Sequence, residues 1–383
     1  MTVAKMKPPF RAEHVGSLKR PERLQRAREK LLGPQPLDNN LAAHDNAELR
    51  AIEDETINEV IKAQEDVGLN VVTDGEFRRR TWWTDFILGF EGTAENTGTD
   101  SPIVVVDKTG HRRPLPSVVV TGKVEWTGSV VRDSFTYLAA RTTRTPKLTI
   151  PAPMQMHYFM GGRAGIDRKA YPDLDAFWDD VATAYRKEID VLAAAGCRYL
   201  QLDDVTLAFL CDPKRRDEVK TWGHEPFELI KIYVAMFNKA VAKRPADMTP
   251  GFHACRGNAG GHWGAEGGYE PVADLLFNTM DVDAYFLEYD TPRAGGFEPL
   301  RFLPKHKTLV LGLISSKEPD LEKPDALKRR IDEAAKFAPL DQLALSPQCG
   351  FASNYIGNPV TADDQRRKLE LVVDVARAVW GNA

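Results

Sequence analysis

A histidine and a cysteine stand two residues apart, as His253 and Cys255, near the end of a short apolar run in the stretch 249–258. In an extended segment, side chains two positions apart point to the same side, so both would face one point. A neutral imidazole and a thiolate are ligands that zinc binds in proteins. Most His-x-Cys pairs arise by chance, so a metal site here requires further ligands from other parts of the chain.

The composition is that of an ordinary globular protein. The 383 residues allow two domains or one large barrel, and 43% hydrophobic with 28% charged residues are globular values. The net charge of −4 gives no reason to expect nucleic acid or an anionic membrane as partner. The sequence begins without a signal peptide, lacks a run of ~18 apolar residues, and has too few cysteines for a disulfide framework. We expect a soluble cytoplasmic protein, with a homo-oligomer left open.

Runs of strand type alternate with runs of helix type along most of the chain. A long helix, for example, is indicated by Leu49, Ile57, Val60 and Ile61 on one side, with Gly68 as its end. The predicted strands occupy residues 10–17, 69–76, 147–153, 199–204, 249–258, 284–288, 307–314 and 343–347. Residues from about 91 to 132 interrupt this pattern with Gly and Thr clusters and Val-rich runs, which indicates a β-hairpin insertion after the second strand.

Eight strands mostly separated by helices predict an α/β fold, a single (β/α)8 TIM barrel that forms one catalytic domain over residues 1–383. A doubly wound open sheet is the alternative. That fold is disfavoured because the sequence lacks a glycine-rich phosphate loop of the dinucleotide or Walker type where such a sheet would place one.

The polar residues at the predicted strand ends would face the same mouth of such a barrel, where its chemistry takes place. They are Ser17, Glu76, Asp203, Asp204, His253, Cys255, Glu288 and Cys349. Cys349 follows the eighth strand in a Gly- and Pro-containing loop, and with His253 and Cys255 it would complete three ligands that leave one tetrahedral position open, as in catalytic zinc sites. Glu288 would either fill that position in the absence of substrate or serve as an ordinary strand-end acid in an ion pair.

Zinc bound by two thiolates and an imidazole is a weak Lewis acid that suits the uptake of a thiol as a thiolate. A free thiol with a pKa of ~8.5 is only slightly ionised at neutral pH. Glu76, Asp203 and Asp204 would bind a cationic group on that thiol, such as an α-ammonium. Two other readings stay open: the aspartates could cap a loop, and Glu76 could pair with the arginines at 78–80, which could equally bind a substrate carboxylate.

Six short segments together resemble a known family. They are HVGS at 14–17, DGE at 74–76, LQLD at 200–203, HAC at 253–255, LE at 287–288 and SPQCG at 346–350. In this order they resemble the catalytic barrel of cobalamin-independent methionine synthase, a zinc enzyme of methionine biosynthesis that methylates homocysteine from a methyl-tetrahydrofolate polyglutamate. The resemblance implies zinc at His253, Cys255, Glu288 and Cys349, and recognition of the amino-acid thiol by Ser17, Glu76 and Asp203. It also implies an aromatic residue near the folate at Tyr158, and it names no catalytic residue beyond the metal site.

The chain departs from the full-length synthase in three ways. It has no room for the family's second, N-terminal barrel, and its seventh strand runs into residues 313–317 where the synthase has a histidine expected to protonate the leaving group. The insertion and the segment 77–83 look like features of short, single-barrel relatives. We therefore expect a zinc-dependent S-methyltransferase that presents homocysteine or a close analogue as a zinc-bound thiolate to a methyl donor, with methyl-tetrahydrofolate as one candidate.

Two other functions remain possible alternatives from the sequence. One is an alkyltransferase of the epoxyalkane:coenzyme M type, in which the thiol has a sulfonate and no amine, so that Glu76 and Asp203 would lack a purpose. The other is a non-catalytic zinc-binding barrel. A metal-free relative is disfavoured because it would leave Cys255 and Cys349 unexplained.

Overall fold

Six parallel strands form the central sheet of the protein. The computed structural model describes residues 7–33, 46–96, 104–106, 112–114, 117–355 and 357–383. The sheet consists of β7 (Leu148–Pro151), β8 (Tyr199–Asp204), β9 (Thr249–Ala254), β10 (Ala284–Glu288), β11 (Thr308–Ile314) and β12 (Leu343–Pro347), hydrogen-bonded side by side in chain order. Every pair of neighbours is parallel, so all six strands end at the same edge.

Two shorter segments extend this sheet at its two edges. The strand β1 (Val71–Val72) pairs in parallel with β6 (Thr145–Pro146), which leads directly into β7. At the other edge, Ala12 forms a parallel bridge with Leu345 of β12. The predicted first strand is reduced to this bridge, and the Phe10 amide donates to the Glu13 carboxylate at 3.0 Å instead of to a neighbouring strand. The eight parallel segments follow the order of a (β/α)8 barrel, as predicted.

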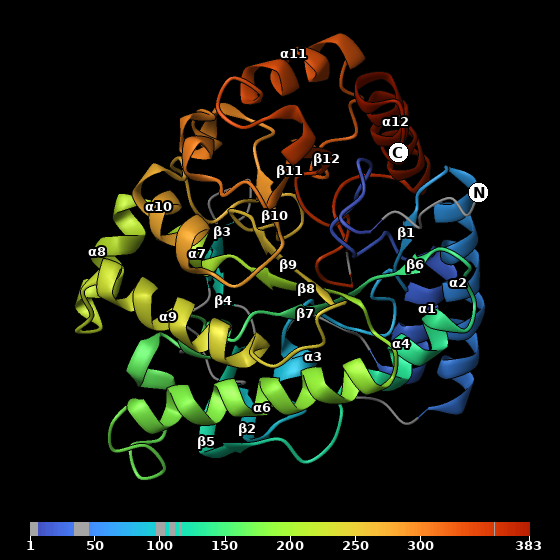
Figure 1. The fold of residues 1–383 in the computed structure, drawn as a ribbon. Helices are drawn as coiled ribbons and strands as arrows, with labels where there is room; N and C mark the ends of the chain where they lie inside the picture. Colours follow the sequence, from blue (N-terminus) through green and yellow to red (C-terminus); the bar gives the residue numbers. More distant parts are fainter. Residues whose placement is uncertain (1–6, 34–45, 97–103, 107–111, 115–116, 356) are drawn as a thin grey trace.

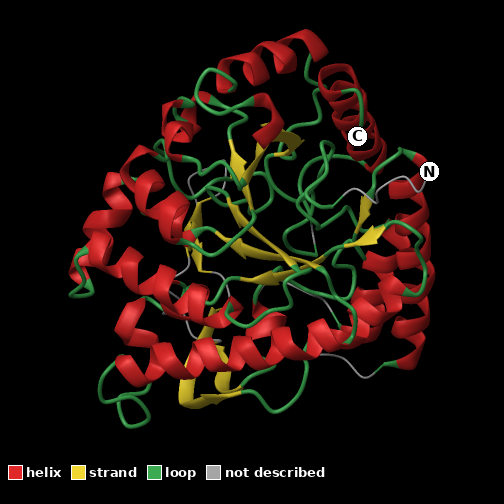
Figure 2. Cartoon of the chain, viewed as in Figure 1, coloured by secondary structure: helices red, strands yellow, loops and turns green. Residues whose placement is uncertain are grey.

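Helices surround the strands (Figures 1 and 2). The longer ones are α1 (Glu22–Leu32), α2 (Ala47–Asp66), α6 (Asp175–Ala194), α9 (Pro226–Val241), α10 (Glu270–Thr279), α11 (Pro324–Ala334) and α12 (Ala362–Trp380). The shorter ones are α3 (Thr84–Ile87), α4 (Arg132–Ala139), α5 (Gln155–Tyr158), α7 (Thr206–Phe209) and α8 (Pro213–Thr221), with 3₁₀ turns at Gly162–Gly165, Pro292–Ala294, Glu298–Phe302 and Leu340–Gln342.

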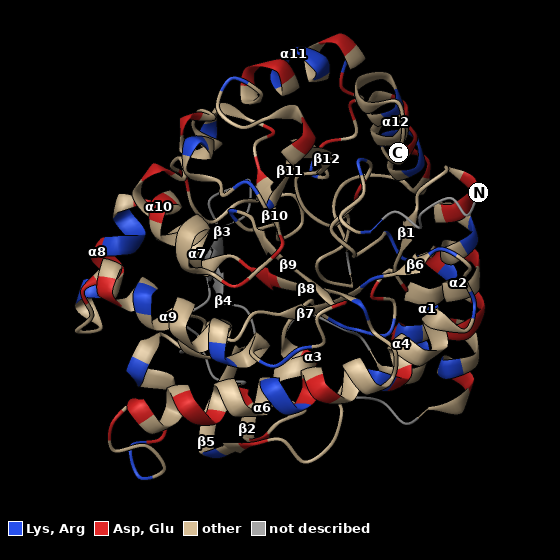
Figure 3. Cartoon of the chain, viewed as in Figure 1, with Lys and Arg blue, Asp and Glu red and all other residues tan. Residues whose placement is uncertain are grey.

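The helices form where the sequence predicts amphipathic segments. The apolar side of α2 buries Leu49, Ile57, Val60 and Ile61, and α12 begins at Thr361 with the expected capping box. Lys, Arg, Asp and Glu are interspersed along the outer helices (Figure 3), in agreement with the small net charge. Among the described residues, no helix is long and apolar enough to cross a membrane.

The predicted hairpin insertion is present between β1 and β7. The strands β2 (Glu91–Asn96) and β5 (Ser117–Glu125) pair antiparallel, as do β3 (Val104–Val106) and β4 (Arg112–Pro114). Residues 97–103, 107–111 and 115–116 of the predicted insertion lie outside the described residues. The chain returning from β5 is tied to α6 by the buried Glu188 carboxylate, which accepts hydrogen bonds from Trp126, at 2.7 Å, and from Ser129, at 2.8 Å.

A buried ion pair lies inside the barrel, below the strand ends. Lys147 Nζ is 3.1 Å from Glu13 Oε2, and both side chains are fully buried. The same ammonium is 3.1 Å from Gln201 Oε1, and Gln201 Nε2 donates to Asp203 Oδ1 at 2.6 Å. A chain of polar contacts therefore connects the barrel interior to an acid at the end of β8.

We expect Lys147→Met to lower the free energy of unfolding by about 3–5 kcal/mol, because it leaves the buried Glu13 carboxylate without its counter-ion. The exposed ion pair between Lys62 and Asp66, at 2.8 Å, offers a matched control. Lys62→Met should leave the urea midpoint where it is in the unaltered protein, since exposed pairs contribute little. Equal midpoints for the two variants would show that the interior pair is not a determinant of stability.

Candidate metal centre

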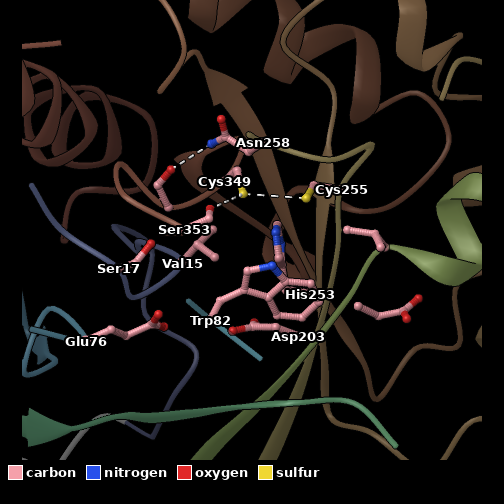
Figure 4. Close-up of a pocket in the computed structure, with 13 residues that line it drawn as sticks. Val15, Ser17, Glu76, Trp82, Asp203, His253, Cys255, Asn258, Cys349 and Ser353 are labelled. Carbon is pink, nitrogen blue, oxygen red and sulfur yellow. Dashed lines mark hydrogen bonds between the residues drawn. The ribbon is translucent and has the colours of Figure 1, made fainter. Parts of the chain in front are cut away.

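Three potential metal ligands meet where β9 and β12 end. His253 lies in β9, Cys255 is the first residue after β9, and Cys349 follows β12. Their ligand atoms all lie within 4.8 Å of one another, and the two sulfurs are 3.5 Å apart. All three side chains are buried, at most 5% exposed (Figure 4). An imidazole and two sulfurs at this spacing match the donor set of a tetrahedral zinc site with an open position.

The hydrogen bonding of His253 leaves one ring nitrogen free for a metal. Nδ1 lies 3.0 Å from the carbonyl oxygen of Phe286, which can only accept, so Nδ1 carries the proton. Nε2 is buried and has no hydrogen-bond partner among the residues that the structure describes. A buried imidazole lone pair without a partner is the arrangement of a metal-ligating histidine held by an outer carbonyl.

The two sulfurs differ in their readiness to ionise. The neighbouring Cys255 thiol lowers the pKa of Cys349 well below its usual range. Burial opposes this shift, and His253 adds to it. Conversely, the contact with Cys349 and then burial raise the pKa of Cys255. In Cys197 and Cys211, by contrast, burial raises the pKa to about 12. The pair at the site therefore holds one negative charge readily, and a cation is needed to hold two.

A cavity opens beside these ligands. Its wall is formed by Val15, Ser17, Glu76, Trp82, Asp203, Asp204, Val205, His253, Cys255, Asn258, Cys349, Gly350 and Ser353. Three of the strand-end residues predicted to bind substrate, Ser17, Glu76 and Asp203, thus share one cavity with the three ligands.

Two of the acids in this cavity are buried without enough nearby positive charge to balance a carboxylate. Burial raises the pKa of Asp203 to about 7, against the opposing effect of His253. Burial also raises the pKa of Glu76, although Arg79 lies 3.5 Å away. Glu76 Oε1 accepts from Thr149 at 2.6 Å, while Oε2 is buried without a partner in the described part of the chain. Glu76 is also held at a positive φ of 60°, a conformation that is rare outside glycine and typical of functional sites.

Asp204 has a different role from its neighbour. It accepts a hydrogen bond from the Leu207 amide at 2.7 Å and another from Gln155. The first contact caps the start of α7, so the loop-capping interpretation applies to Asp204. Within the residues that the structure describes, Asp203 has no such helix-capping contact, and it lines the cavity.

Comparison with known proteins places the chain in a family. Residues 15–244 match the family model described as the catalytic domain of cobalamin-independent synthase. The chain belongs to the cobalamin-independent methionine synthase family. It is therefore an enzyme, a methyltransferase related to 5-methyltetrahydropteroyltriglutamate–homocysteine methyltransferase, and the alternative of a non-catalytic barrel is set aside.

Relatives of this methionine synthase family are similar over different lengths. The uncharacterized protein YxjH of Bacillus subtilis is 43% identical over 99% of this chain and 97% of its own length. The 5-methyltetrahydropteroyltriglutamate–homocysteine methyltransferase of Bacillus velezensis is 25% identical over 95% of this chain, which spans only 42% of that protein.

Solved structures from the methionine synthase family share the fold. A protein from Listeria monocytogenes, assigned as a vitamin-B12 independent methionine synthase, has a TM-score of 0.74 and 34% identity, with 99% of this chain and 100% of that chain covered. A B12-independent methionine synthase from Shewanella, in complex with selenomethionine, has a TM-score of 0.68 and 20% identity over 96% of each chain. The latter likeness concerns the fold alone.

Two residues that the family resemblance assigns to the site are not among the residues grouped here. Glu288 is outside the group of three ligands in the described residues, and its carboxylate contacts Arg256, Arg293 and Lys317. Tyr158, in α5, is not part of the cavity lining, and its ring packs edge-on against Trp222 with centroids 5.3 Å apart. The metal role of Glu288 and the substrate role of Tyr158 therefore stay predictions.

Trp82, Asn258 and Ser353 line the cavity although sequence reasoning did not assign them to it. Trp82 reaches the wall because its backbone amide donates to the Ser353 carbonyl at 2.8 Å and Thr81 bridges to Asn354. The Trp82-Trp83 pair after three arginines could have drawn attention to this segment in the sequence. Ser353, the hydrogen-bond partner of Trp82 about 270 positions further along the chain, has no such local pattern.

We expect the protein purified without chelator to contain a stoichiometric transition metal, measured by inductively coupled plasma analysis. His253→Ala and Cys349→Ala should each reduce the metal content to a small fraction, because either change removes a ligand from a three-residue site. Cys197→Ala and Cys211→Ala are matched controls that should retain it, since these thiols lie outside the group. Metal retained by the two site variants would contradict the assignment.

Gly350, next to Cys349, offers a test of how closely the site is packed. A Cβ at this position would lie 1.9 Å from Ser17 Oγ and 3.1 Å from Ser17 Cβ. Gly350→Ala should therefore lower the thermal midpoint, and Ser17→Ala in the same chain should restore most of the loss by removing the hydroxyl. Gly128→Ala is the control, because that position is open to solvent space. A Gly350→Ala variant as stable as the control would show that the two loops are free to separate.

Proposed function

We propose that the enzyme methylates the sulfur of homocysteine or a close analogue at a zinc ion held by His253, Cys255 and Cys349. The observation that carries this proposal is the single cavity in which these three ligands and the acids Glu76 and Asp203 meet. One wall suits a soft metal and a sulfur, and the other suits an ammonium. A thiol amino acid has both groups.

The donor set supports zinc. Two sulfurs and a neutral imidazole favour a borderline-soft ion. His253 Nε2, which has no hydrogen-bond partner in the described residues, would be the third ligand atom beside the two sulfurs. When bound, zinc would supply the charge that keeps a substrate thiol ionised at neutral pH and leaves its sulfur nucleophilic. The burial of Cys255 and Cys349 would keep bulk water from competing with that sulfur.

The residues of the opposite wall would orient the substrate. Glu76 Oε2 and the Asp203 carboxylate would accept hydrogen bonds from the α-ammonium, which supplies the positive charge that these buried acids lack. Ser17, beside Gly350, would contribute its hydroxyl to the amino-acid end of the substrate. Glu76 is itself held by Thr149, and Asp203 by Gln201, so both acids are oriented before the substrate arrives.

The reaction would form a carbon–sulfur bond and break the bond from the methyl group to its donor. The substrate sulfur supplies the electron pair, its proton is lost to solvent, and the donor leaves with the electrons of the broken bond and takes up a proton. Methyl-tetrahydrofolate is the donor that the family relationship favours. The methyl end of such a donor would approach the thiol through the opening of the cavity, and the remaining part of the donor would lie outside.

We expect Glu76→Gln and Asp203→Asn each to weaken homocysteine binding by roughly ten- to a hundredfold, since a hydrogen bond to a charged group contributes about 1.5–3 kcal/mol. The matched control is 4-mercaptobutyrate, which is homocysteine without its amine and should bind all three proteins equally. Calorimetric titration of the zinc-loaded proteins measures both affinities.

The same titration separates the alternative function. An alkyltransferase of the epoxyalkane:coenzyme M type would bind coenzyme M tightly and would be indifferent to both substitutions. If homocysteine affinity is unchanged in Glu76→Gln and Asp203→Asn while coenzyme M binds and reacts with an epoxide, the proposed methyltransfer to an amino-acid thiol is wrong.

A further inference from the structure

Arg20 is a buried arginine that joins two loops of the barrel mouth through their backbone carbonyls. Its Nη2 donates to the carbonyl of Glu76 at 2.6 Å and to that of Arg79 at 2.8 Å. Its Nη1 donates to the carbonyl of Ala352 at 3.3 Å and to that of Asn354 at 3.1 Å. One guanidinium therefore connects the turn that follows β1 to the loop that follows β12.

The two segments that Arg20 connects carry residues from both walls of the cavity. The turn at 76–79 begins with Glu76, and the loop after β12 carries Cys349 and Ser353, which also line the cavity. Glu76 has a positive φ of 60°, a backbone conformation that persists only where surrounding contacts hold it. Its own carbonyl is one of those that Arg20 binds, so the direction of the Glu76 carboxylate depends on this contact.

We propose that Arg20 is a positioning residue for the substrate amine: by holding the two loops together, it fixes the Glu76 carboxylate relative to the candidate metal ligands. This inference rests on the proposed function, in which Glu76 binds the α-ammonium of the thiol. Arg20 is not among the residues that line the cavity, so it would act on the substrate through Glu76.

A guanidinium suits this role because its N–H donors lie in one plane and diverge from separate nitrogens. Each terminal nitrogen of Arg20 serves one loop. Burial, and then the nearby charge of Arg28, lower the pKa of Arg20 to about 10, so the group keeps its charge at neutral pH. A lysine would keep that charge, but its donors all lie on one nitrogen and would serve one loop only.

A double-mutant cycle between Arg20→Lys and Glu76→Gln tests the inference. In the zinc-loaded protein, Arg20→Lys should weaken homocysteine binding by roughly tenfold, since a misplaced carboxylate loses part of its charged hydrogen bond. The affinity for 4-mercaptobutyrate, which lacks the amine, should stay as in the unaltered protein. In the Glu76→Gln background, Arg20→Lys should cause no further loss, because the carboxylate that it positions is already absent. Calorimetric titration measures all of these affinities.

Arg216→Lys is the matched control. Arg216 also donates to two backbone carbonyls, those of Leu210 and Cys211, both at 2.9 Å, and neither residue lines the cavity. This variant should keep the affinity for both thiols. Additive losses from Arg20→Lys and Glu76→Gln would show that the two residues act independently and would overturn the inference. An unchanged homocysteine affinity in Arg20→Lys would overturn it as well.

Circular dichroism establishes whether Arg20→Lys folds. If it does not, Arg20→Gln takes its place in the cycle, because a glutamine amide donates hydrogen bonds without a buried charge. Unfolding of both variants would show that Arg20 is required by the fold as a whole, and would overturn a role directed at the substrate.

Failure of the proposed function would look different in the same titrations. An unchanged homocysteine affinity in Glu76→Gln would contradict amine binding by Glu76, and with it both the proposed function and this inference. Weakened binding in Glu76→Gln with an additive loss from Arg20→Lys would contradict the inference alone and leave the proposed function standing.

Discussion

The register of three neighbouring parallel strands fixes the composition of this site. In the sheet, His253 of β9 lies opposite Asp203 of β8 on one side and Phe286 of β10 on the other. One level of the barrel thereby contains the candidate metal-ligating imidazole, the acid proposed to bind the substrate and the carbonyl that sets the imidazole tautomer. A slip of one residue in β9 would turn His253 away from the mouth and would separate all three functions at once.

The polar contacts that run from Glu13 through Lys147 and Gln201 to Asp203 explain how the barrel tolerates buried acids at its mouth. Asp203 is buried at the strand end, and its orientation depends on Gln201, whose amide oxygen is in turn held by Lys147. Glu13 balances the lysine and also accepts from the Tyr199 hydroxyl at 2.8 Å. Because each polar group in this chain has a partner, the burial of one more acid at the mouth is tolerated without disrupting the apolar layers around it.

Sequence reasoning places a residue where its position follows from chain direction, and it says little where the position depends on side-chain partners. The alternation of strands and helices was enough to place Ser17, Glu76, Asp203, His253, Cys255 and Cys349 at one mouth, since parallel strands end at one edge. The contacts of Glu288 depend on Arg293 and Lys317, which carry no mark of that pairing in the sequence. The packing of Tyr158 against Phe209 and Trp222 likewise depends on partners distant in the sequence. Trp82 reaches the cavity through backbone contacts with Ser353 and of Thr81 with Asn354, which no local pattern indicates.

The two walls of the cavity restrict which molecules fit it. The sulfurs lie on one side of His253, with Asp203 and Glu76 on the other (Figure 4). A thiol that touches both walls needs a cationic group only a few bonds from its sulfur. Most of the rest of the lining, Val15, Trp82, Val205, Asn258 and Ser353, is apolar or neutral, and the remaining acid, Asp204, is engaged by the Leu207 amide and by Gln155. A methyl donor that approaches along the neutral residues would meet no fixed charge, and a buried charge on that path would be costly without a partner. In the proposed function, the cavity would therefore select the thiol by charge and the donor by shape.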